Sequence, residues 1–160
     1  KARVISIVKP RRGDTDSNAH RVALFRTGVE MIGAHPLLGV GPERVEKEFE
    51  RYAPADIPRP FPRAWWYGHL HNIYVQYAAE RGIPAMLCII GFIVWTFWNV
   101  ARAALRAPAD RAWMLHGIAA VILGVLVTGG FEHSLGDSEI LQLTLGLITL
   151  GGRLAQDPVI

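Results

Sequence analysis

Two uncharged runs in the second half of the sequence limit what this chain can fold into. One lies between Arg81 and Arg102 and the other between Arg111 and Glu132, and each contains 20 residues without Asp, Glu, Lys or Arg. A helix of this length is about 30 Å long, which matches the hydrocarbon core of a membrane. The runs therefore predict two transmembrane helices. In the alternative, a soluble all-α protein, both helices would have to be buried in the core.

A third uncharged run, between Glu139 and Arg153, has only 13 residues and predicts a short or tilted crossing. We therefore expect an all-α fold, that of an integral membrane helical protein fragment. An external loop region with interfacial helices, residues 1–82, would precede two or three transmembrane helices in residues 83–160. These helices are expected at about residues 84–101, 112–131 and 139–152.

Charge divides the chain at the same place. Residues 1–82 contain 13 Lys and Arg against 9 Asp and Glu, whereas residues 83–160 contain 4 against 5. A basic region beside membrane helices suits anionic lipid headgroups or lipid-linked phosphates, so we expect these partners and no nucleic acid. The loop from Arg102 to Arg111 contains three arginines and one acid. The positive-inside rule places this loop in the cytoplasm and residues 1–82 on the opposite face.

An amphipathic helix is predicted from His20 to Ala34. Its apolar residues recur at helical spacing, and the helix is too charged to cross a membrane, so an interfacial position is expected. The apolar stripe consists of Val22, Phe25, Val29 and Ile32. The helix should end at His35, because the residue before a proline disfavours the α region.

A proline-rich segment separates this helix from the next. Four prolines fall within nine positions from Pro54 to Pro62, which predicts an irregular loop. Trp65, Trp66 and Tyr67 follow, and they are expected either to anchor the chain at the headgroup level or to stack on a sugar ring.

The segment from His71 to Pro84 connects the external region with the first uncharged run. We expect a helix from about His69 to Arg81, ended by Gly82. Near a helix N-terminus the dipole favours a neutral imidazole that accepts protons, and unpaired backbone N–H groups attract phosphate. His71 is therefore a candidate general base beside a phosphate site. The alternative is a histidine that is only hydrogen-bonded at the interface.

Arginines form a second group of candidates, because their guanidinium groups make bidentate contacts with phosphate. One or two of the external arginines are expected in a site: Arg21, Arg26, Arg59, Arg63 and Arg81. Glu132 follows the second uncharged run and is a candidate for orienting a base or an arginine.

No metal site or cofactor is predicted. His69 and His71 are two residues apart and would diverge on a helix, unlike the i, i+4 histidines of zinc-binding helices. A metalloenzyme, the alternative, would need further ligands such as Glu132 and His133, brought close by the fold.

Three stretches resemble the signature region of the bacterial O-antigen ligase/polymerase family of membrane glycosyltransferases. Residues 21–25 (RVALF) resemble the arginine-led start of the family's external helix, and residues 31–41 (MIGAHPLLGVG) resemble its proline–glycine turn. His71 and Gly82 fit its pattern of a histidine, ten residues and a glycine. The residues around Glu132 are similar to the family's last external loop. Phe25 stands where the family's ligases have the leucine of an arginine, three residues, leucine motif, so ligase and polymerase both remain open.

The resemblance implies a multi-pass protein of the bacterial inner membrane with its active face in the periplasm. Its expected activity is transfer of a glycan from an undecaprenyl-pyrophosphate carrier to a glycan or lipid-linked acceptor, without a nucleotide sugar or a required metal. Carried over by position, His71 is the candidate base and Arg21 the candidate pyrophosphate ligand. Asn72, Arg63 and Glu132 are predicted as further substrate contacts. The alternative is a non-catalytic membrane protein that binds carrier lipid during polysaccharide assembly or export.

Overall fold

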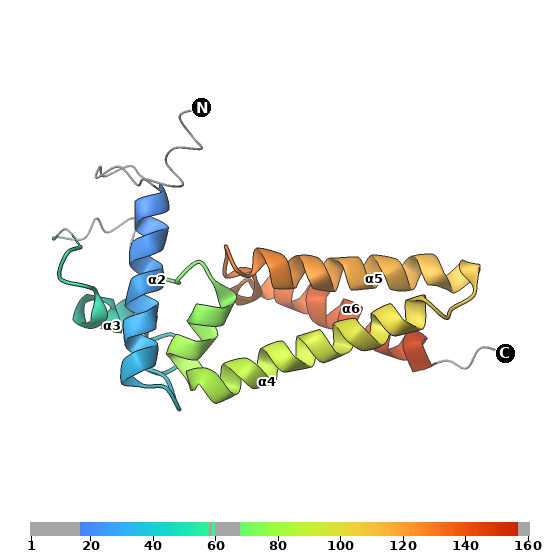
Figure 1. The fold of residues 1–160 in the computed structure, drawn as a ribbon, viewed down its shortest axis with the longest axis horizontal. Coiled ribbons are helices and arrows are strands. Elements are labelled where there is room, and N and C mark those ends of the chain that lie inside the picture. Colours follow the sequence, from blue (N-terminus) through green and yellow to red (C-terminus); the bar gives the residue numbers. More distant parts are fainter. Residues whose placement is uncertain (1–16, 58, 60–67, 157–160) are drawn as a thin grey trace. The chain divides into compact units, whose positions relative to one another are not determined.

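The computed structural model describes residues 17–57, 59 and 68–156. Their fold is all-α, with helices joined by loops, as predicted (Figure 1). The elements are α2 (Ser17–Ala34), α3 (Val45–Tyr52), α4 (Ile73–Ala104), α5 (Ala109–Thr128), the short 3-10 helix η1 (Ser134–Gly136) and α6 (Ser138–Gln156). They form two compact units, one up to Met86 and the other from Leu87. The predicted contacts of Arg63 and of the aromatic residues 65–67 lie outside the described residues.

Helix α2 has two apolar faces, and the sequence predicted only one of them. The face buried in the first unit carries small and medium-sized side chains, Ala23, Leu24, Thr27 and Met31. Three residues of the predicted stripe lie on the surface instead, Val22, Phe25 and Val29, each about half exposed, whereas its fourth residue, Ile32, packs against the core. An apolar stripe on the surface is what an interfacial helix requires, and the interfacial position stays a prediction.

Helix α3 and the start of α4 complete the core of the first unit. Val45 and Phe49 of α3 are buried against the inner face of α2, and Val75 and Ala79 of α4 belong to the same core. Helix α4 begins at Ile73, so the prediction that His69 and His71 lie within it is wrong. Gly82 interrupts α4 with φ 84° and ψ 162°, where the sequence predicted a helix end.

Helices α4 and α5 are each long and apolar enough to cross a membrane. Only 17% of the most apolar 18-residue stretch of α4 and 22% of that of α5 is buried inside the protein. A core helix of a soluble protein would be mostly buried, so this exposure argues against the soluble alternative. The third crossing and the assignment of faces stay predictions.

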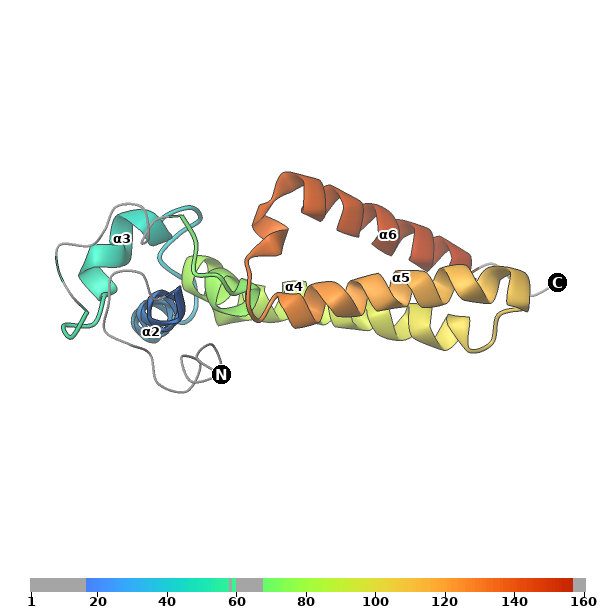
Figure 2. The same cartoon turned by 90° about the horizontal axis from the view of Figure 1, so that it is seen from above.

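The three helices of the second unit converge toward the end that carries the α4–α5 connection (Figures 1 and 2). Gly151 of α6 packs closely on both other helices, because an added Cβ would stand 2.9 Å from Cγ2 of both Ile118 and Val100. Small residues allow this close packing of apolar helices in a membrane, where water supplies no hydrophobic drive between helices.

Candidate active site

The loop that follows α2 packs against the turn of α4 just before Gly82. Three backbone hydrogen bonds join the two segments: Val40 N–H to Ala79 O at 2.8 Å, Gly41 N–H to Glu80 O at 3.0 Å, and Ile83 N–H to Pro36 O at 2.8 Å. The proline–glycine turn and the Gly82 interruption are thus two sides of one structural element within the first unit.

Glycine is required on both sides of this contact. Gly39 and Gly82 have φ values of 66° and 84°, in the left-handed region that side chains disfavour. A Cβ on Gly39 would overlap the backbone of Glu80, and a Cβ on Gly82 would overlap the carbonyl group of Leu37. The two segments therefore meet backbone to backbone.

His71 lies just outside α4, between two anchored residues. On its C-terminal side Asn72 caps the helix, since its Oδ1 accepts the N–H groups of Tyr74 at 2.9 Å and Val75 at 3.0 Å. On its N-terminal side the buried Leu70 donates its N–H to Gln76 Oε1 at 2.8 Å. His71 itself has φ 50°, an uncommon conformation for a non-glycine residue, and the anchored neighbours on both sides stabilise it.

The cap changes the expected phosphate site. Two N–H groups of the first turn of α4 are already bound by Asn72, so they do not offer free donors to an anion. A phosphate next to His71 would depend more on side-chain cations such as Arg21. A contact between the Asn72 amide and substrate stays a prediction.

Three histidines gather at this point of the first unit. The ring centroids of His69 and His71 are 4.3 Å apart, and those of His20 and His71 are 6.0 Å apart. Burial lowers the pKa of His20, and the charges of His71, Arg21 and His69 lower it further. Arg21 is thus electrostatically coupled to the same histidine that lies beside His71. The sequence reasoning missed His20, whose one signal is its place directly before Arg21.

The adjacent rings correct the expectation that His69 and His71 diverge. They do not lie on a helix, and their two imidazoles offer a pair of metal ligands. A metal ion would need at least one more ligand from elsewhere in the chain.

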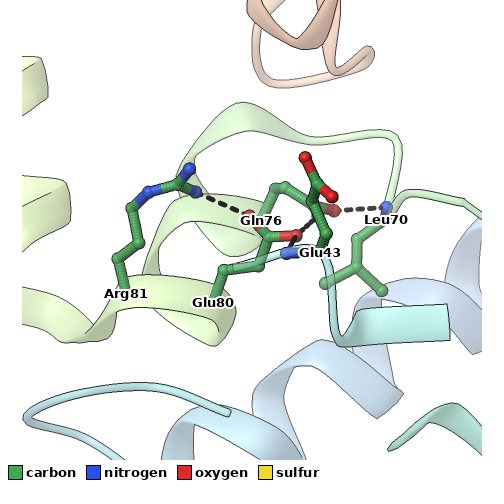
Figure 3. A network of polar contacts seen from close by, with 5 residues as sticks. All are labelled: Glu43, Leu70, Gln76, Glu80 and Arg81. Carbon is green, nitrogen blue, oxygen red and sulfur yellow. Dashed lines mark hydrogen bonds and ion pairs between the residues drawn. The ribbon is translucent and has the colours of Figure 1, made fainter. Parts of the chain in front are cut away.

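Gln76 and Glu80 form a buried polar pair one turn apart on α4 (Figure 3). Gln76 Nε2 donates to Glu80 Oε1 at 2.8 Å, and the same oxygen accepts the N–H of Glu43 at 3.1 Å. Arg81 Nη1 binds the other oxygen, Oε2, at 2.6 Å. The sequence reasoning missed this pair as well. Two polar residues four apart, next to Val75 and Ala79, indicate a side-chain contact along a helix.

The remaining candidates are distributed as follows. Arg26 forms a two-contact ion pair with Asp56 at 2.7 and 3.0 Å, and Arg81 is committed to Glu80, so both have carboxylate partners within the first unit. Glu132 belongs to the second unit, where its Oε1 accepts the N–H of His133 at 3.1 Å.

Comparison with known protein families identifies the first unit. The sequence model of a family described as O-antigen ligase matches residues 2–90, which is more than half of the chain and includes Arg21, His71 and Gly82. The chain belongs to the O-antigen ligase family. No curated protein and no solved structure gives a match.

Membership of the O-antigen ligase family gives the structure its functional class. The family comprises glycosyltransferase-like membrane proteins of ligase or polymerase type that act in polysaccharide assembly on lipid-linked glycans. The two exposed apolar helices agree with a membrane protein. The matched residues contain the interlocked glycines and the histidine cluster.

Proposed function

We propose that this protein transfers an oligo- or polysaccharide from undecaprenyl pyrophosphate to a sugar hydroxyl, with His71 as general base. The observation that carries the proposal is the conformation of His71, held at φ 50° between two anchored neighbours. Strained backbone of this kind gathers at active sites. The location of His71 inside the family-matched residues supports the same assignment.

The proposed step is a displacement at the anomeric carbon of the donor. The acceptor hydroxyl gives its proton to His71 while its oxygen forms the new glycosidic bond, and the bond from the anomeric carbon to pyrophosphate breaks. The carrier pyrophosphate leaves as an anion, so it needs positive charge rather than an acid, and Arg21 is proposed to supply it. The proton on His71 then passes to water.

The proposal includes a location and further contacts. Residues 1–82 would lie on the periplasmic face of a bacterial inner membrane, with the part of α4 after Gly82 and α5 as crossings and α6 as the third. Asn72, Arg63 and Glu132 are proposed to contact the glycan or the pyrophosphate. No metal is proposed, because the leaving group needs only the charge of arginine.

Transfer assays on the complete protein in lipid vesicles test this proposal. His71→Ala should reduce transfer by about 100-fold or more while donor binding is retained. Arg21→Gln should weaken donor binding about tenfold or more, since a charge-assisted hydrogen bond is lost. His116→Gln, at an exposed histidine of α5, is the matched control and should transfer normally. EDTA should have no effect.

Unchanged transfer by His71→Ala would contradict the assignment of the base and favour a non-catalytic protein that holds carrier lipid. Loss of activity in EDTA, restored by a divalent metal, would contradict the metal-free mechanism.

A further inference from the structure

We infer that the buried pair Gln76–Glu80 positions His71 for proton transfer, an inference that rests on the proposed role of His71 as base. The argument begins with the backbone of the histidine. Because φ at His71 is 50°, its neighbours must hold it there, and the hydrogen bond from Leu70 N–H to Gln76 Oε1 fixes the His69–Leu70 peptide, one residue before it. Gln76 thus controls one side of the His71 loop, and the Asn72 cap controls the other.

Glu80 determines which way the Gln76 amide points. An ionised carboxylate only accepts hydrogen bonds, so Glu80 Oε1 requires the NH2 end of Gln76 at their 2.8 Å contact. The amide oxygen is then left facing Leu70 N–H, at the same distance. With a side chain at position 80 that cannot accept, the Gln76 amide would lose this orientation and Leu70 would lose its partner.

The loop after α2 in turn holds Glu80 through two hydrogen bonds. Its Oε1 accepts the N–H of Glu43 (Figure 3). Its backbone carbonyl accepts the N–H of Gly41. Glu43 and His71 are the two non-glycine residues with positive φ among the residues that the structure describes. Glu43 stands at one end of this network and His71 directly follows Leu70 at the other end, so the pair connects the docked loop to the residue before the candidate base.

The location of a carboxylate here needs a reason beyond stability. Glu80 is 6% exposed and Gln76 2% exposed, and a carboxylate that loses its water is a weak source of stability even when it is paired with the partly exposed Arg81. An apolar pair would avoid the desolvation of the carboxylate, but it would leave the N–H groups of Leu70 and Glu43 without these acceptors. A fixed amide orientation next to His71 is what the polar pair adds.

Turnover measurements on Gln76→Leu in the complete protein test the inference. With kcat counted per donor-binding site, kcat should fall about 10- to 100-fold because the base is displaced, while the donor KM stays within about twofold. Glu80→Gln should keep kcat near that of the parent protein, since the new amide oxygen still accepts from Gln76 and Glu43. Thr27→Val is the matched control: it removes a buried hydrogen bond to Ala23 O in the same core, and kcat should not change.

A double substitution separates positioning from general damage. In a His71→Ala background, Gln76→Leu should cause no further loss of the residual activity, because the residue it positions is gone. A parental kcat in Gln76→Leu, or an equal extra loss in the His71→Ala background, would overturn the inference. If Gln76→Leu does not fold, Glu80→Leu takes its place with the same expected outcomes. Full activity in His71→Ala would instead refute the proposed function, so the two failures are distinguishable.

Discussion

Gly82 lies so close to Leu37 that the two residues touch through their backbones. The N–H of the next residue, Ile83, binds the carbonyl of Pro36 at 2.8 Å, which draws the loop onto the point where α4 is interrupted. The histidine, ten residues, glycine pattern therefore has a physical basis. The helical stretch after the Asn72 cap ends where the loop docks. The ten residues of the pattern are therefore the length of chain between His71 and that contact.

Gly82→Ala should destabilise the protein severely. An alanine at φ 84° and ψ 162°, a region that almost only glycine adopts, costs about 1–3 kcal/mol for its backbone conformation alone, and its Cβ would overlap the Leu37 carbonyl. Thermal unfolding in detergent should show a clear loss of stability. Gly33→Ala is the control: it lies in α2 with open space around a new Cβ and should be neutral or slightly stabilising. Equal stability of the two variants would contradict the interlocked contact.

Asn72 allows capping and substrate contact to be measured separately. Asn72→Ala should cost about 1 kcal/mol of stability, because the N–H groups of Tyr74 and Val75 lose their acceptor. Asn72→Asp keeps that acceptor, so unfolding should match the parent protein. We expect Asn72→Asp to bind the donor less tightly, because it replaces an amide donor with a negative charge beside pyrophosphate. Parental donor affinity in Asn72→Asp would restrict Asn72 to its cap.

The sequence predicted what depends on local patterns and missed what depends on contacts between distant segments. The uncharged runs are sufficient to predict α4 and α5, since length and apolarity are local properties. The buried face of α2 was missed because Ala23 and Thr27 carry little hydrophobic signal, and only the packing of α3 and α4 selects them. The side-by-side arrangement of His69 and His71 follows from a turn whose backbone angles no sequence pattern specifies.

The histidine cluster predicts a pH dependence of stability. The pKa of His20 in the fold lies below its value of 6.5 in the unfolded chain, first through burial and then through the charges of His71, Arg21 and His69. As the pH falls through 6.5 the unfolded chain takes up a proton that the folded state resists, so stability decreases; above 6.5 the full stability is present. Unfolding temperatures of the complete protein between pH 5 and 8 should therefore rise with pH. His20→Gln should reduce that rise. A rise that is the same in both proteins would show that another group controls the acid side.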